Sequence, residues 1–138
     1  MRKLIYLFIT TIMVSGCAMT KSQVTAPNRA NLMKLSIGMT KENVLKVMGT
    51  KPGVICPFVG PFTGIAMRHT INNPYRSEIL QGKDKTFEVL YYATDDKNNT
   101  LAITDDELTP LVFDDSKLIG RGWSFLDQNL QRYEIRLR

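Results

Sequence analysis

The residues of this chain that could do covalent chemistry are few. There are two cysteines, Cys17 and Cys56, and one histidine, His69. A thiolate is a strong nucleophile and an imidazole can generate it, so Cys56 and His69 could in principle form a catalytic pair. No third residue can be identified that would orient the imidazole, and nothing in the sequence brings the pair together. We therefore expect a buried structural thiol at Cys56, no catalytic residue and no cofactor.

Five carboxylates lie in or shortly before an acidic insertion at residues 100–110: Asp95, Asp96, Asp105, Asp106 and Glu107. A calcium site needs about six to eight oxygen ligands on a tight loop, and these residues lack the D-x-D-x-D-G spacing. We expect no metal site here and a solvated loop instead. Alternatively, Thr104 caps a helical turn that begins at Asp105. Both interpretations place the charges in water.

The first sixteen residues have the anatomy of a secretory signal peptide. Arg2 and Lys3 precede an uncharged stretch from residue 4 to residue 14, and small residues follow. That stretch is shorter than the roughly twenty residues a helix needs to cross a bilayer. The next segment, Val14-Ser15-Gly16-Cys17, resembles the bacterial lipobox, which implies cleavage after residue 16 and acylation of Cys17.

Acylation of Cys17 would attach the protein to a membrane, because several acyl chains together anchor a protein essentially permanently. It would also leave Cys56 as the only thiol in an oxidising compartment. Two alternatives remain open: a plain signal peptide with an incidental cysteine, and a disulfide between Cys17 and Cys56. Ala18, rather than Asp, follows the cysteine. By analogy with the enterobacterial sorting rule, this implies the outer membrane, facing the periplasm.

The remaining chain has the size of one domain. Residues 17–29 are mostly polar and small, which predicts a lipidated cysteine followed by a flexible tether, and residues 30–138 form the domain. A hydrophobic share of 43% and a charged share of 22% are typical of a folded protein and exclude a polytopic membrane protein. The formal net charge is +5, with two of the cations in the signal, so we expect no nucleic-acid partner.

Helical signals come first along this domain. Residues 29–35 can form one or two turns. The surest element is a helix over 41–48, in which Thr40 accepts a hydrogen bond from the backbone near Asn43 and Met39 is spaced to pack on Val44. Gly49 supplies the left-handed residue that ends this helix.

Strand signals follow the helices. Residues 86–93 have a period-two pattern that includes aromatic side chains, which predicts a strand. A strand over 75–80 and a hairpin connection at 81–85 are predicted before it. A second hairpin is predicted, with strands over 111–113 and 118–123 and a turn at 114–117. Gly120 and Gly122 are expected to mark a bulge or a close contact. A last strand is predicted over 133–137, and residues 125–130 are not assigned. The pattern predicts an α+β two-layer sandwich, with N-terminal helices packed on an antiparallel β-sheet.

The segment from Leu35 to Pro52 resembles the signature of the SmpA/OmlA (BamE-like) family of small outer-membrane lipoproteins. Gly38, Met39, Thr40, Val44 and Gly49 fall on matching positions, and residues 111–123 look like the hairpin that closes that fold. The resemblance implies a Gram-negative outer-membrane lipoprotein that helps to stabilise the machine inserting β-barrels. The barrel-assembly subunits would then be its protein partners.

One apolar segment could form a binding surface. Residues 54–67 carry no acidic residue, Lys or Arg and are interrupted by prolines and glycines, which forbid a regular helix. If the segment is exposed, Phe58 and Phe62 would contact a partner or lipid head groups. If it is not, the loop folds over the domain's own core.

The expected function is that of a non-enzymatic binding module anchored through Cys17 and acting in outer-membrane protein assembly or envelope integrity. The alternatives are an inhibitor or ligand-binding lipoprotein on the same scaffold, and a paralogue that acts outside the assembly machine.

Overall fold

The computed structural model describes residues 19–55, 68–98 and 100–133. In this part of the chain the helices are α2 (Lys21–Leu32), α3 (Lys41–Met48) and α4 (Trp123–Arg132). The longer strands are β3 (Arg76–Gln81), β4 (Thr86–Ala93), β5 (Leu108–Asp114) and β6 (Lys117–Arg121). Two short strands, β1 (Gly53–Ile55) and β2 (His69–Ile71), and a 3-10 turn, η1 (Asp105–Glu107), complete the elements.

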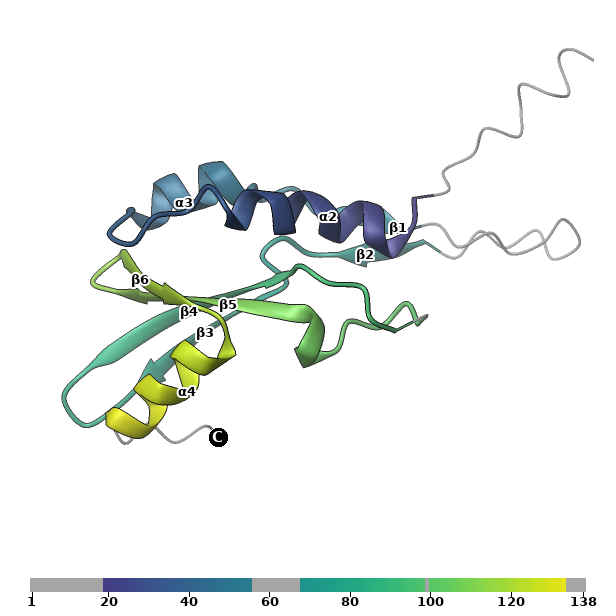
Figure 1. The fold of residues 1–138 in the computed structure, drawn as a ribbon. Helices are drawn as coiled ribbons and strands as arrows, with labels where there is room; N and C mark the ends of the chain where they lie inside the picture. Colours follow the sequence, from purple (N-terminus) through teal and green to yellow (C-terminus); the bar gives the residue numbers. More distant parts are fainter. Residues whose placement is uncertain (1–18, 56–67, 99, 134–138) are drawn as a thin grey trace, which may run out of the picture.

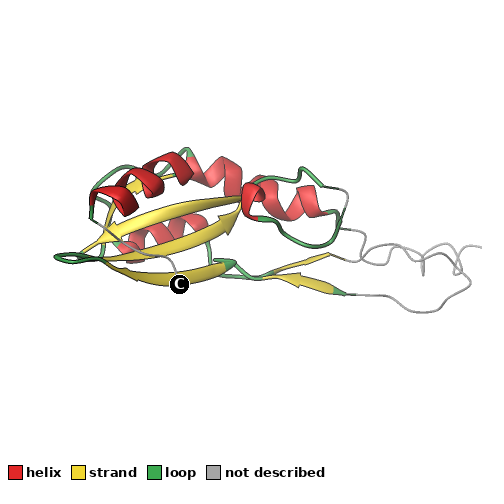
Figure 2. Ribbon diagram, turned by 90° about the horizontal axis from the view of Figure 1, so that it is seen from below, coloured by secondary structure: helices red, strands yellow, loops and turns green. Residues whose placement is uncertain are grey.

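The four longer strands form an antiparallel meander in the order β3-β4-β5-β6, so each strand pairs with the next one in sequence. Helices α2 and α3 lie over one face of this sheet and α4 lies over the other (Figure 1). The β1–β2 pair extends beyond one end of the larger sheet (Figure 2). The predicted α+β class, with N-terminal helices packed on an antiparallel sheet, is confirmed, and α4 adds a layer that the sequence did not predict.

Strand β4 shows why both faces of the sheet are covered. Successive side chains of a strand point to opposite faces. Phe87, Val89 and Tyr91 belong to the core that includes Leu126 of α4. The alternate residues Leu90 and Tyr92 belong to the core that includes Val44 and Met48 of α3. A strand buried on both faces reads as a nearly continuous apolar run rather than a strict alternation.

The predicted helix α3 is confirmed at both ends. The Thr40 hydroxyl accepts a hydrogen bond from the Asn43 N–H at 3.4 Å. Met39 packs against the same core cluster that contains Val44. Gly49 ends the helix with φ of 80°, a backbone angle that L side chains rarely adopt.

Both predicted hairpins are also confirmed. The second one turns at Asp115 and Ser116, whose φ angles are 48° and 59°. Two consecutive positive φ values match the right-handed twist of the flanking strands. A Cβ on Gly120 would lie 2.3 Å from the Phe125 ring, so this glycine marks a close contact, as predicted. The same prediction is wrong for Gly122, which is the N-cap of α4 and whose Cβ would have no described atom within 4 Å.

The prediction of a flexible tether up to residue 29 is wrong for the described residues. Lys21–Leu32 form helix α2, which Thr20 opens with a capping box. The buried positions of α2 are Lys21, Thr25 and Asn28, spaced i, i+4 and i+7 on one face. A search for an apolar face misses such a helix because its buried face is polar.

The C-terminal region also differs from the prediction. Residues 125–130, left unassigned, lie within α4, whose first residue is Trp123. The predicted strand 133–137 begins at Tyr133, which is the C-cap of α4, and its remaining residues lie outside the described part. The helix was missed because its N-cap is Gly122, at φ of 88°, rather than a Ser, Thr, Asp or Asn.

Candidate functional site

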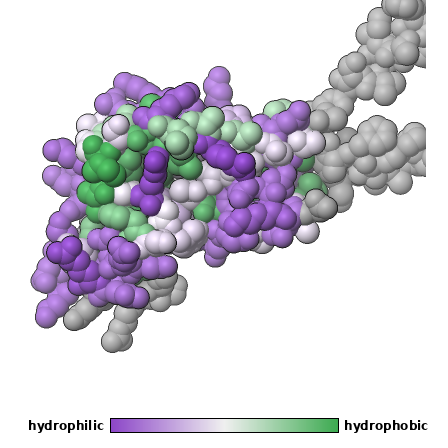
Figure 3. Space-filling model, in the orientation of Figure 1, coloured by the Kyte–Doolittle hydropathy of each residue, from purple (hydrophilic) through white to green (hydrophobic). Residues whose placement is uncertain are grey.

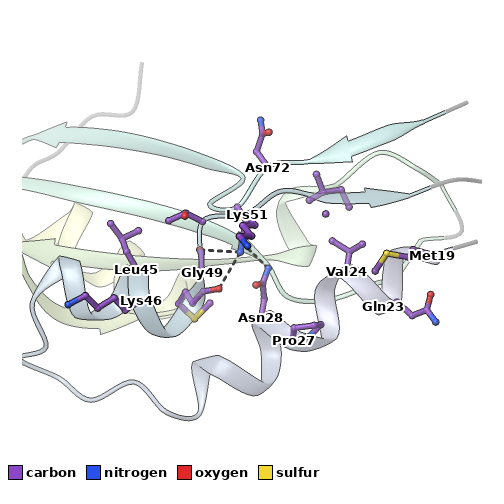
Figure 4. Close-up of a pocket in the computed structure, with 15 residues that line it drawn as sticks. Met19, Gln23, Val24, Pro27, Asn28, Leu45, Lys46, Gly49, Lys51 and Asn72 are labelled. Carbon is purple, nitrogen blue, oxygen red and sulfur yellow. Dashed lines mark hydrogen bonds between the residues drawn. The ribbon is translucent and has the colours of Figure 1, made fainter. Parts of the chain in front are cut away.

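A groove lies between α2, the end of α3 and the β1–β2 pair, and it has a volume of about 610 Å³ (Figure 4). Its apolar lining comes from Met19, Val24, Pro27, Leu45, Met48 and Ile71. Lys46 and Lys51 are also part of the lining, and no described lining residue is acidic. The volume falls within the roughly 300–1,000 Å³ typical of binding pockets.

An asparagine pair fixes the walls of this groove. The Asn28 side-chain amide donates to Asn73 Oδ1 at 3.1 Å and to the Ala93 carbonyl at 2.8 Å. The Asn73 amide donates to the carbonyls of Met48 and Gly49, both at 3.2 Å. These bonds join α2, the end of α3 and the sheet, and they supply partners for two carbonyl groups at the end of α3.

Strand β1 closes the groove on the side of α2. A Cβ on Gly53 would lie 2.2 Å from the Val24 side chain, so the strand can pass this helix closely only because residue 53 is glycine.

The first turn of α2 is held by a buried ion pair. Lys21 Nζ lies 2.7 Å from both carboxylate oxygens of Glu107 and 3.0 Å from the Ala102 carbonyl. Lys21 is 6% exposed and Glu107 is fully buried. The pair joins residues 86 positions apart in sequence, so it ties the start of α2 to the turn before β5.

Glu107 is stabilised in its ionised form by more than Lys21. Its carboxylate also accepts hydrogen bonds from the backbone N–H groups of Lys97, Asn98 and Thr104, at 2.8 to 3.1 Å. Burial alone would raise the pKa of Glu107, but the hydrogen bonds from Lys21 and from these three N–H groups outweigh it and lower the pKa to about 2.

The prediction that all five carboxylates lie in water is therefore wrong for Glu107. The alternative, a helical turn capped by Thr104, is confirmed as η1 with its capping box. The other four carboxylates are exposed or half-buried: Asp95, Asp96, Asp105 and Asp106. Among the described residues, no group of three or more His, Cys, Asp or Glu side chains could hold a metal ion.

A second attachment of α2 lies closer to the solvent. Arg29 donates to the Thr94 carbonyl at 2.9 Å and pairs with Asp95. Both side chains of this ion pair are largely exposed, so the pair contributes little to stability.

The remaining predicted site residues are mostly outside the described part of the chain. Cys17, Cys56, Phe58 and Phe62 all lie there. His69 is half-buried in β2, opposite Ile55. The sequence analysis predicted neither the groove nor the burial of Lys21. The i, i+4, i+7 spacing of the polar residues Lys21, Thr25 and Asn28 is the signal that could have predicted helix α2.

Hydrophobic side chains also gather at the end of the molecule that carries the α2–α3 turn (Figure 3). Met33 and Ile37 are exposed there. None of the helices in the described ranges is both long enough and apolar enough to cross a membrane.

One family model matches part of the chain. The model of a family described as a protein of unknown function (DUF3192) matches residues 65–128, less than half of the chain. This segment contains β3 to β6 and Glu107, and it excludes α2 and α3. No curated protein matches the chain, and no solved structure matches it.

Proposed function

We propose that this chain is a lipid-anchored outer-membrane lipoprotein that faces the periplasm and acts as a non-enzymatic binding module. Cys17 would carry the lipid. The role would be accessory, in outer-membrane protein assembly or envelope integrity. The lipobox-like segment 14–17 and the resemblance of residues 35–52 to the SmpA/OmlA family support this proposal.

The observation that carries the proposal is the groove beside α2. It is open, largely apolar and rigidly walled, as binding sites for other molecules are. Its lining includes Met19, two residues after Cys17. An anchor concentrates a binding site near its membrane partners, so even a weak contact in the groove would be effective.

The charge of the lining supports a proposal for the chemistry of the partner. Lys46 and Lys51 place positive charge beside apolar surface. We propose that the groove binds an apolar polypeptide segment flanked by carboxylates, on an envelope protein. By the family resemblance, a barrel-assembly subunit is the first candidate. Phe58 and Phe62, in the apolar segment between β1 and β2, are proposed as additional contacts to the partner or to lipid.

Site-specific photocrosslinking in living cells tests the partner. A benzophenone amino acid replaces Lys46 in the groove, and in the control it replaces Lys34, which is exposed outside the groove. We expect the probe at position 46, but not the probe at position 34, to capture a barrel-assembly subunit. Identical products at the two positions, or no assembly subunit at position 46, would contradict the proposed role.

Intact mass spectrometry of the protein from envelopes tests the anchor separately. We expect a chain that begins at Cys17 and carries acyl groups. A free thiol at residue 17, or a disulfide between Cys17 and Cys56, would refute lipid anchoring.

A further inference from the structure

Two exposed apolar side chains lie at the end of the molecule where the described chain begins. Met19 is 44% exposed and Leu101 is 36% exposed. Lys21 Nζ donates hydrogen bonds to the carbonyls of Thr100 and Ala102, the two neighbours of Leu101, at 3.4 Å and 3.0 Å. The loop that carries Leu101 and the start of α2 therefore lie side by side, as Figure 1 also shows. We call Met19 and Leu101 the anchor-end surface.

The anchor-end surface is tied closely to residue 17. Only four residue steps separate Cys17 from Lys21, and an extended chain spans at most about 3.6 Å per residue, or about 14 Å in all. Lys21 itself is fixed to Glu107 inside the domain. A tether that was flexible up to residue 29 would let the domain stand well away from the anchor, whereas this connection cannot.

We infer that the anchor-end surface rests on the lipid bilayer, with Met19 and Leu101 in contact with the head-group region. The inference depends on the proposed acylation of Cys17. Apolar side chains on a surface held at a bilayer gain by leaving water. The charged groups around this surface are paired within the domain: Lys21 with Glu107, Lys97 with Asp106 at 3.7 Å and Arg76 with Asp105 at 3.1 Å. Asp96 lies 3.9 Å from Lys21.

The same geometry orients the rest of the domain. Helix α2 has twelve residues and is therefore about 18 Å long. Its other end leads into the turn that carries the exposed Met33 and Ile37. With the start of α2 at the lipid, this turn lies at the opposite end of the domain, away from the anchor (Figure 1).

Fluorescence quenching by lipid measures this orientation. The processed lipoprotein is reconstituted into phosphatidylcholine vesicles that contain a lipid with a nitroxide on its head group. In a Cys56→Ser background, a bimane dye is attached at Leu101→Cys or, as the matched control, at Ile37→Cys. Both native side chains are exposed, so neither substitution disturbs the core. We expect quenching several-fold stronger at position 101 than at position 37.

A longer linker tests the short connection. Insertion of about ten Gly and Ser residues between Ala18 and Met19 gives the domain a flexible tether. Quenching at position 101 should then fall toward the value at position 37. Unchanged quenching at position 101 would refute the role of the short connection, and equal quenching at the two positions without the insertion would refute the contact itself.

The mass of the reconstituted protein separates the two hypotheses. If Cys17 carries no acyl groups, the proposed function fails. If Cys17 is acylated and positions 101 and 37 are quenched equally, only the orientation is wrong.

Discussion

Replacing Glu107 by Gln tests whether the buried ion pair holds α2 to the domain. The substitution keeps the size of the side chain and removes its charge. Lys21 then stays buried, with a neutral partner in place of a carboxylate at 2.7 Å. The Gln side chain also has only one accepting oxygen, because its NH2 group donates, so some of the backbone N–H groups that now donate to Glu107 lose their acceptor.

The expected loss in the free energy of unfolding is large. Removing one partner of a buried ion pair costs about 3–5 kcal/mol, because it leaves an uncompensated buried charge. A typical domain has only about 5–15 kcal/mol of stability in total. The double variant Lys21→Met/Glu107→Gln leaves neither charge, so it should lose less than the sum of its two single variants.

Urea denaturation measures these differences, with the fluorescence of Trp123, the only tryptophan, as the probe. The matched control is Asp95→Asn, which removes the carboxylate that pairs with Arg29. Arg29 lies on α2, like Lys21, but its ion pair is exposed. We expect this control to cost about 0–1 kcal/mol. If Glu107→Gln costs no more than Asp95→Asn, or if the double variant is fully additive, the ion pair does not hold α2 in place.

Three further predictions concern the same domain. The pKa of Glu107 is about 2 in the folded state against 4.5 in the unfolded chain, so the unfolded chain takes up the proton first as pH falls. About 3 kcal/mol of stability should therefore be lost between about pH 4.5 and pH 2, and urea titrations at several pH values should show a smaller loss in Glu107→Gln. Gly120→Ala should cost about 1–3 kcal/mol because its Cβ would clash with the Phe125 ring, and Phe125→Leu should recover part of this loss in urea denaturation if the clash is the cause. Thr40→Ala should cost about 1 kcal/mol through loss of the cap of α3, whereas Thr40→Ser should cost little; equal melting temperatures for the two variants would contradict the capping role.

Local signals in the sequence predicted much of the fold. Helix α3 has its cap at Thr40 and its terminator at Gly49 within ten residues of each other, so its bounds could be read directly. The strands of the two hairpins are rich in apolar and aromatic residues and are separated by turn residues, which is why their pairing was also predicted. Each of these elements is specified by residues close together in the chain.

Helix α2 and the groove could not be predicted in this way. The helix buries Lys21, Thr25 and Asn28, and Lys21 is buried only because Glu107 lies beside it in the fold. The i, i+4, i+7 spacing of these polar residues is visible in the local sequence, but the partner that allows Lys21 to be buried, 86 positions away, is not. The groove likewise combines side chains from α2, α3 and the β1–β2 pair, which come together only in the folded domain.

The meander topology has a consequence for the order in which this domain folds. Strands β3 to β6 pair only with their neighbours in sequence, so each pairing closes a short loop at small entropic cost. Docking of α2 must close a much longer loop, and we expect it to follow formation of the sheet. Pulse-labelling hydrogen exchange should show the amides of α2 becoming protected after those of β4 and β5. If Cys17 is acylated as proposed, the segment beside it would then remain accessible to the processing enzymes while the rest of the domain folds.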